Sequence, residues 1–277
     1  MSENFDLKEL QEKILEIVEY FDRLCNKNGI TYYLMGGSAL GAIRHLGFIP
    51  WDDDFDVFMD YENYTKFIKI IDDKLDKNLF YFQHEDSNEW PLFFSKIRMN
   101  NTTFIEKNLK NRDMHHGIYI DIMCLNNTSK YMPIRYLQYF AARLLTAKAL
   151  GKQNYTTENI PKRVILFFSK FFINDFIKVQ LLKFIRSFNQ KDTGMVGHFF
   201  GRAPFKKTSF DISYLGKPRY VEFENFQLPV PRYVERYLEV RFGNRYMEIP
   251  SEKEKMKYPT HAYIVDTNKS YEHYILS

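Results

Sequence analysis

The feature that most constrains this chain is a glycine turn followed, about one short helix later, by a cluster of carboxylates. The turn is Gly36-Gly37-Ser38, and the carboxylates lie in the run Trp51-Asp52-Asp53-Asp54-Phe55-Asp56-Val57. Free backbone N–H groups and the helix dipole at such a turn favour phosphate. Carboxylates can hold the divalent cation that accompanies a diphosphate. The pairing therefore indicates chemistry on a nucleoside diphosphate.

The composition predicts a folded protein in a reducing compartment. The 277 residues are 45% hydrophobic and 17% aromatic, which suits one elaborated domain or a domain with a subdomain. Two cysteines, Cys25 and Cys124, are too few for a disulfide framework or a four-cysteine zinc site, and their apolar surroundings predict buried thiols. The N-terminus lacks an apolar run, and no stretch approaches the length of a membrane span. We therefore expect a cytoplasmic protein.

The positive charge is concentrated in one segment. The whole chain carries a net charge of +4, but residues 130–192 contain 12 basic and three acidic residues, a net +9. The remainder of the chain is therefore net acidic. Because no nucleic-acid-binding motif accompanies the basic segment, we do not expect a nucleic-acid partner.

Hydrophobic periodicity predicts alternating helices and strands, and hence an α/β (α+β) fold. The first part of the chain is expected to form a helix at 7–25, a strand at 31–35, a helix capped by Ser38 and reaching about residue 45, a strand at 54–59 and a helix at about 62–76. Further expectations are strands at 79–84, 92–98, 102–106 and 118–124, helices within 132–190, a loop-rich region at 197–217, a strand or hairpin at 220–228, a helix at 232–240 and weak signals over 250–277.

Three carboxylates are candidate metal ligands. Asp54 and Asp56 are two residues apart, so on a strand they point to the same face, while Phe55 and Val57 point into the core. Two carboxylates on one face suit a divalent cation that keeps open positions for phosphate oxygens. Asp121 stands alone in an apolar strand, where a buried acid needs a counter-charge such as a metal. The alternative for Asp121 is a hydrogen-bonded acid at a strand end.

Five further residues are candidates for phosphate binding. Gly37 and Ser38 lie at the strand-to-helix turn, although such a turn is also an ordinary helix start. Arg44, near the end of that helix, can add a positive charge or can be a solvated arginine. Lys96 and Arg98 alternate on one strand face, so both can reach a diphosphate or both can lie at a solvated strand edge.

The substrate candidates are Trp51, Asp52 and Asp53, which precede the carboxylate pair. Asp52 and Asp53 can equally belong to an exposed acidic loop. Aromatic rings attract quaternary ammonium groups, so Trp51 and Trp90 are candidates for binding such a group, although most rings must belong to the core. An EF-hand is excluded because the twelfth position, counted from Asp52, is Asn63.

The run from Gly37 to Asp56 closely resembles the signature of the LicD family. Later blocks of the sequence are also similar to this family: Ser95-Lys96-Ile97-Arg98 with Thr103-Phe104, Ile120-Asp121-Ile122, and Phe242-Gly243-Asn244-Arg245-Tyr246-Met247 with Pro250, Pro259 and His261. The resemblance touches most of the chain outside residues 130–192. It implies a nucleotidyltransferase-like mixed sheet.

The same resemblance implies roles for individual residues. Asp54, Asp56 and Asp121 correspond to the metal triad, with Mg²⁺ as the expected ion and Mn²⁺ as a second possibility. Gly37 and Ser38 correspond to the phosphate turn. His261 joins the nucleotide-binding set on the resemblance alone. The implied reaction moves a phospho-alcohol, typically phosphocholine from CDP-choline, to a sugar of a lipid-linked glycan or teichoic acid precursor.

We expect a catalytic core at 1–129, a helical basic insertion at 130–192 and a C-terminal part at 193–277 that completes the core. Residues 163–172 mix aromatic and basic side chains, as helices at a membrane interface do. The insertion is therefore either a surface that contacts anionic lipid, on the inner face of the cell membrane, or a helical cap with a solvated basic face.

Two other functions stay open. A metal-dependent glycosyltransferase also places an Asp-x-Asp pair beneath a nucleotide-sugar diphosphate, but it needs no glycine turn and releases a nucleoside diphosphate. A non-catalytic membrane-surface scaffold built on an inactive transferase is the second, and the intact acidic triad argues against it. The sequence leaves open whether choline, glycerol or ribitol is carried, which sugar accepts it, and the oligomeric state.

Overall fold

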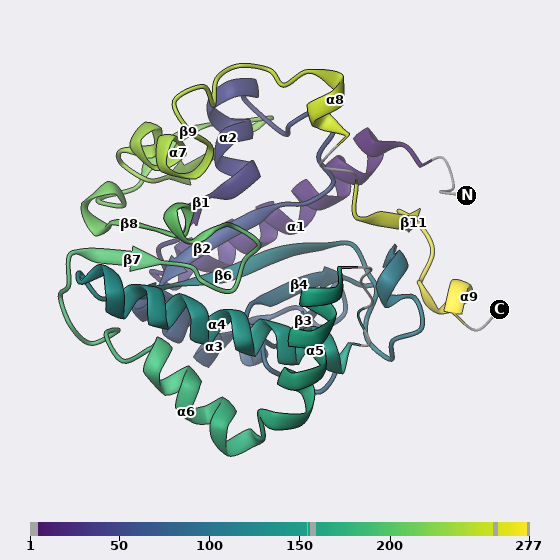
Figure 1. Cartoon of the computed structure of the whole chain (residues 1–277). Helices are drawn as coiled ribbons and strands as arrows, with labels where there is room; N and C mark the ends of the chain where they lie inside the picture. Colours follow the sequence, from purple (N-terminus) through teal and green to yellow (C-terminus); the bar gives the residue numbers. More distant parts are fainter. Residues whose placement is uncertain (1–4, 154, 156–158, 257–259, 276–277) are drawn as a thin grey trace.

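A curled mixed sheet lies at the centre of the molecule (Figure 1). The computed structural model describes residues 5–153, 155, 159–256 and 260–275. Seven strands of these described residues form the sheet, in the order β1-β2-β6-β4-β3, with β7 paired to β6 and β8 paired to β7. They are β1 (Tyr33–Leu34), β2 (Asp56–Asp60), β3 (Phe80–Gln83), β4 (Ser95–Met99), β6 (Tyr119–Asn127), β7 (Met195–Gly197) and β8 (Ser209–Asp211). The mixed α/β fold expected from the sequence is confirmed.

One parallel pair lies inside this otherwise antiparallel sheet. β2 runs parallel to β6, and the other paired strands of the sheet run antiparallel. Two small sheets lie outside it: β5 (Thr103–Glu106) pairs with β11 (Ala262–Asp266), and β9 (Arg219–Phe223) forms a hairpin with β10 (Phe226–Val230). The hairpin confirms the alternation predicted for 220–228, whereas β11 lies within residues 250–277, where the local sequence signals are weak.

Helices cover the sheet on both sides (Figure 1). They are α1 (Leu7–Lys27), α2 (Gly36–His45), α3 (Tyr61–Lys74), α4 (Met132–Lys152), α5 (Ile160–Phe172), α6 (Asp175–Ile185), α7 (Val234–Phe242), α8 (Glu252–Lys255) and α9 (Glu272–Ile275). α1 begins where the Asp6 side chain accepts a hydrogen bond from Lys8 N, which satisfies one free N–H of the first turn. α1 and α3 both contact β6, because their apolar stripes face the sheet.

The two faces of β2 differ in polarity, as the alternation predicted. Phe55 and Val57 are fully buried in the main hydrophobic core. Asp54 and Asp56 point to the other side of the strand, where a cavity begins. Cys25 and Cys124 are buried free thiols, as expected. Among the helices of the described residues, none is long and apolar enough to cross a bilayer.

Several element boundaries differ from the sequence-based expectation, and three of these differences lie at β2, β4 and α2. The strand expected at 92–98 begins at Ser95, and the strand expected at 54–59 begins at Asp56. The helix expected to be capped by Ser38 begins two residues earlier, at Gly36. Gly36 has a φ of +61°, a conformation that glycine adopts readily, so the chain turns into the helix before Ser38 is reached.

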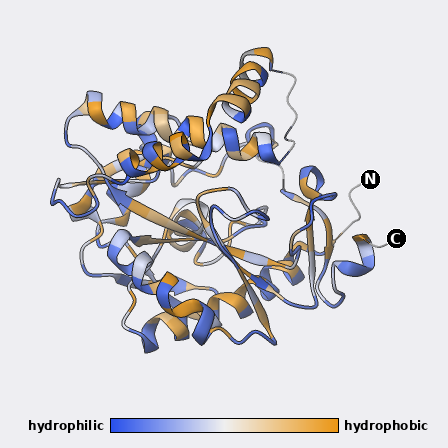
Figure 2. Cartoon of the chain, turned by 90° about the horizontal axis from the view of Figure 1, so that it is seen from below, coloured by the Kyte–Doolittle hydropathy of each residue, from blue (hydrophilic) through white to orange (hydrophobic). Residues whose placement is uncertain are grey.

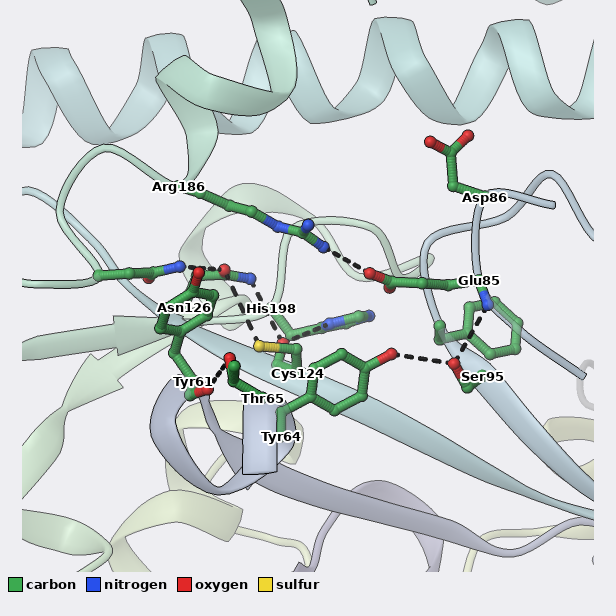
Figure 3. Close-up of polar contacts among 12 residues, drawn as sticks. Tyr61, Tyr64, Thr65, Glu85, Asp86, Ser95, Cys124, Asn126, Arg186 and His198 are labelled. Atoms are coloured by element: carbon green, nitrogen blue, oxygen red, sulfur yellow. Dashed lines mark hydrogen bonds and ion pairs between the residues drawn. The ribbon is translucent and has the colours of Figure 1, made fainter. Parts of the chain in front are cut away.

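Two ion pairs fasten the α4–α6 layer to the sheet, and Figure 3 shows the one between Glu85 and Arg186. Glu85, after β3, binds Arg186 at 2.7 Å, and both side chains are largely buried. Its neighbour Asp86 binds Lys178 of α6 at 2.8 Å. The Glu85 backbone N–H also donates to Ser95 Oγ of β4. The insertion is therefore held to the core by charges as well as by packing.

Replacing one partner of a buried ion pair leaves the other charge unpaired, which destabilises the fold strongly. We predict that Glu85→Gln lowers the free energy of unfolding by about 2–3 kcal/mol, measured by urea denaturation. The matched control is Glu19→Gln, which removes an exposed pair with Arg23 and is expected to cost less than about 0.5 kcal/mol. Equal losses in the two variants would contradict the prediction.

Candidate active site

The parallel pairing of β2 with β6 brings two of the predicted carboxylates side by side. Asp56 stands opposite Asp121 in the strand register, and the Asp121 N–H donates to the Phe55 carbonyl at 2.9 Å. Asp54 precedes β2 on the same face, and all three carboxylates line one cavity. Sequence positions more than 60 residues apart are thus gathered at one place.

The glycine turn closes directly against these carboxylates. A Cβ atom on Gly36 would come within 2.8 Å of Asp56 Oδ2, and one on Gly37 within 2.7 Å of Asp52 Oδ2. The Gly36 N–H donates to the Tyr237 hydroxyl, and the Ser38 hydroxyl accepts from the Asp56 N–H at 2.8 Å. Ser38 is therefore not the helix cap that the sequence predicted. It ties the start of α2 to the start of β2.

The cavity has a volume of about 720 Å³ and is lined on several sides by cations. Lys96 of β4 and His261 before β11 lie in its wall, together with Arg143, Arg202 and Arg241. Such a concave site with convergent charged groups suits a small charged ligand. Three carboxylates and several cations share the space, so the cavity can hold a cation and an anion together.

Two of the cations contact the carboxylates directly. The buried Lys96 Nζ lies 2.5 Å from Asp121 Oδ1 and 3.3 Å from the centre of the Tyr119 ring. His261 Nδ1 lies 3.2 Å from Asp53 Oδ1 and 3.6 Å from Asp54 Oδ2. The hydrogen bond to Asp53 raises the pKa of His261 to about 9. His261 is therefore a cation at neutral pH.

Burial and mutual repulsion raise the pKa values of the carboxylates. The pKa of Asp54 rises to about 6, mainly through burial, and His261 limits the rise. The pKa of Asp52 rises to about 8 through burial and the charge of Asp54. Burial, followed by the charges of Asp54 and Asp121, raises the pKa of Asp56 well above its usual value. Burial also raises the pKa of Asp121, against the effect of Lys96.

The carboxylate oxygens are ligands of the kind that Mg²⁺ prefers. Among the residues that the structure describes, no group of three or more His, Cys, Asp or Glu side chains is already gathered as a metal site. The donor chemistry nevertheless fits a hard cation, because Asp54 and Asp56 lie in the same cavity with raised pKa values. A bound divalent ion would supply the counter-charge for these repelling groups.

Seven predicted site residues are not among those that line the cavity: Gly37, Ser38, Arg44, Trp51, Asp52, Asp53 and Arg98. The Arg44 guanidinium donates to the carbonyls of Tyr246 and Glu248, and it thereby holds the C-terminal loop. Arg98 is fully buried and donates to Gln83 Oε1 and the Gly117 carbonyl. Trp51 packs beneath Lys255, with Nζ 4.2 Å from the ring centre. Asp53 is buried rather than exposed, and it accepts hydrogen bonds from His261 and Ala262.

The cavity also contains residues that sequence reasoning did not select. Gly36 was seen only as part of the turn, although its positive φ and its contact with Asp56 make it the tightest position there. Arg143 of α4 was counted only as part of the basic segment. Arg202 and Arg241 come from regions with weak or purely helical signals. Because arginine is common on surfaces, no local pattern separates these residues from solvated ones.

The mixed sheet, the glycine turn and the strand-borne carboxylates are the features that the resemblance to a nucleotidyltransferase-like fold implies. Residues 29–147 match the family model described as LicD/FKTN/FKRP, nucleotidyltransferase domain. The resemblance to the LicD family found in the sequence is thus confirmed for residues 29–147.

Two curated relatives extend this match. The chain is 27% identical over 262 residues to the lipopolysaccharide cholinephosphotransferase LicD of Haemophilus influenzae. This alignment covers 94% of this chain and 98% of that protein. The chain is also 25% identical over 169 residues to mannosyltransferase regulator 4 of Saccharomyces cerevisiae, covering 57% of this chain and 14% of that much longer protein. The first alignment includes the helical insertion and the C-terminal part, whereas the family model ends at residue 147.

A carboxylate whose pKa is raised by folding makes the folded state less stable as pH rises, because the unfolded chain loses that proton earlier. We predict that Asp56→Asn stabilises the metal-free protein by about 1–3 kcal/mol at pH 8. The gain should shrink as pH falls toward the ordinary aspartate pKa, where the unfolded chain also holds the proton. Urea denaturation with a chelator at pH 8 and pH 5 measures it. The control is Asp73→Asn, at an exposed aspartate, which should change the free energy of unfolding little. A lower free energy of unfolding for Asp56→Asn than for the parent protein at pH 8 would contradict the prediction.

Proposed function

We propose that this protein transfers a phospho-alcohol, phosphocholine in the first instance, from CDP-choline to a sugar hydroxyl of a glycan. The observation that carries the proposal is one cavity in which Asp54, Asp56 and Asp121 lie close to cations and to a glycine turn at the start of a helix. The match to a cholinephosphotransferase along nearly the whole chain supports the same reaction.

The donor diphosphate would lie between the glycine turn and the cations of the cavity. The start of α2 offers N–H groups and the positive end of the helix dipole, which favour an anion. Lys96 and His261 would hold phosphate oxygens, and each has a carboxylate beside it. Arg202 and Arg241 line the same cavity and would add positive charge.

Asp54, Asp56 and Asp121 would hold the metal ion, with Mg²⁺ as the first expectation and Mn²⁺ as the second. When bound, the ion would neutralise charge on the diphosphate, which is the main requirement of phosphoryl transfer. Asp121 is also proposed to accept the proton of the acceptor hydroxyl. Its pKa, raised by burial, brings its basicity closer to that task than an ordinary aspartate.

In the proposed reaction the acceptor oxygen attacks the phosphorus distal to the nucleoside. A new oxygen–phosphorus bond forms in line with the bond to the nucleoside monophosphate, which breaks and releases CMP. The proton of the hydroxyl passes to the carboxylate. We propose that the acceptor is a lipid-linked glycan or teichoic acid precursor at the inner face of the cell membrane.

The decisive experiment identifies the nucleotide that is released. The protein is incubated with Mg²⁺, a glycolipid extract and, in turn, CDP-choline, CDP-glycerol and CDP-ribitol. We predict acceptor-dependent release of CMP from CDP-choline, and loss of that release with a chelator or in Asp56→Asn. Turnover of nucleotide-sugars with release of a nucleoside diphosphate would instead identify a glycosyltransferase. Absence of turnover with every donor would favour a non-catalytic scaffold.

A second prediction distinguishes the effect of displacing the Asp56 carboxylate on CMP release from the effect of backbone strain alone. Gly36→Ala and Gly29→Ala both force an alanine to a φ near +60°, which costs about 1–2 kcal/mol. Only at position 36 does the added Cβ meet a carboxylate, because nothing lies within 4 Å of the Cβ at position 29. CMP release should fall about 100-fold in Gly36→Ala and little in Gly29→Ala. Similar losses in both variants would refute the role of the turn.

A further inference from the structure

Helix α5 and the start of α6 expose an unusual number of large apolar side chains. We call this set the α5–α6 surface: Ile160, Val164, Ile165, Phe167, Phe168, Phe171, Phe172, Phe176 and Ile177. Of the described side chains of α5, only Leu166 and Ser169 are buried. In Figure 2, α5 stands out from the body of the molecule and is orange along most of its length. Contiguous apolar patches of this kind mark interaction sites on soluble proteins.

The aromatic rings of this surface lie against one another instead of entering a core. The rings of Phe167 and Phe171 are 4.8 Å apart, and those of Phe168 and Phe172 are 5.5 Å apart. Phe171 and Phe172 are 65% and 66% exposed. The rings therefore offer an apolar layer to whatever covers α5.

The charges of α5 and α6 indicate what that partner is. Residues 160–185 contain five basic residues and one acidic residue, Asp175, whose carboxylate lies 3.4 Å from Lys148 Nζ. Arg163 and Lys170 of α5 and Lys183 of α6 are exposed. Two copies of this surface would bring like charges together, which opposes self-association. Lys178 is paired with Asp86, so the basic residues available to a partner are exposed ones such as Arg163, Lys170 and Lys183. Exposed aromatic and basic side chains together match the headgroup region of an anionic bilayer.

The length of α5 fits a helix that lies on a bilayer. It has 13 residues, whereas about 20 are needed to cross the hydrocarbon core. We propose that the α5–α6 surface rests in the headgroup layer of an anionic membrane, with its phenylalanines in the acyl boundary and its basic residues at lipid phosphates.

Such docking would bring the catalytic cavity to the membrane. α5 packs closely on α4, where a Cβ on Gly151 would lie 3.3 Å from Lys170 Cβ and 3.4 Å from the Leu166 carbonyl oxygen. Arg143, Thr146 and Leu150 of the same α4 helix line the cavity. One rigid helix thus connects the docking surface to the site. The benefit of this arrangement for a lipid-linked acceptor rests on the proposed function. Membrane docking itself does not depend on that function.

The test measures binding to vesicles without any nucleotide. We predict that the protein floats with vesicles of equal parts phosphatidylcholine and phosphatidylglycerol, and much less with phosphatidylcholine alone. Phe171→Ser/Phe172→Ser should reduce the bound fraction roughly tenfold, since both apolar and electrostatic contacts are needed for stable binding. Arg163→Glu/Lys170→Glu should reduce it similarly and weaken its dependence on salt.

The control replaces two large exposed side chains on other elements. Leu79→Ser/Tyr220→Ser changes side chains that are 54% and 53% exposed on other elements, and it should bind vesicles like the parent protein. Equal binding by the phenylalanine variant overturns the proposal. The proposal is also overturned if the parent protein sediments as a stable dimer and Phe171→Ser/Phe172→Ser sediments as a monomer, because the surface would then be an interface between copies. CMP release with a water-soluble acceptor should be unchanged in every variant, so a failure of docking is distinguishable from a failure of the proposed reaction.

Discussion

The site depends on one constraint: several partly buried carboxylates are held close together at one cavity. The parallel pairing of β2 with β6 puts Asp56 beside Asp121, and the glycine turn closes against Asp56. Like charges in such surroundings repel, which is why folding raises the pKa values of Asp54 and Asp56. The opposite side of the same strand offsets this cost, because Phe55 and Val57 are fully buried there. Apolar burial on one side of β2 thus offsets the repulsion between carboxylates on the other side.

The helical insertion takes part in the same site. Arg143 of α4 lines the cavity and donates to the Gly201 carbonyl, which fixes the loop that carries Arg202. The ion pair between Glu85 and Arg186 fastens the layer to the edge of the sheet. A basic segment that looked separable in the sequence is therefore a wall of the cavity. Arg143 of this segment adds positive charge to the cavity wall, while Arg163, Lys170 and Lys183 are exposed on the outside.

Sequence patterns predicted the parts of the fold that local periodicity decides. The alternation around Asp56, the amphipathic α1 and α3 helices and the β9–β10 hairpin were all expected, because neighbours in the chain determine which face is apolar. Long-range packing decides the rest. Lys96 and Arg98 are two residues apart on one strand, yet Lys96 contacts Asp121, whereas Arg98 donates hydrogen bonds to Gln83 and to a backbone carbonyl. No pattern along β4 distinguishes the two residues.

The C-terminal tail shows why weak local signals can accompany a strong structural role. β11 is held by pairing with β5 and by the buried carboxylate of Asp53, which accepts hydrogen bonds from His261 and the Ala262 N–H. A buried carboxylate without such partners would cost several kcal/mol, so Asp53 and the tail each require the other. The same contact turns His261 toward Asp54 and keeps it charged. A residue that periodicity could not identify is therefore positioned by an acid more than 200 positions earlier in the chain, and the tail completes the electrostatics of the cavity.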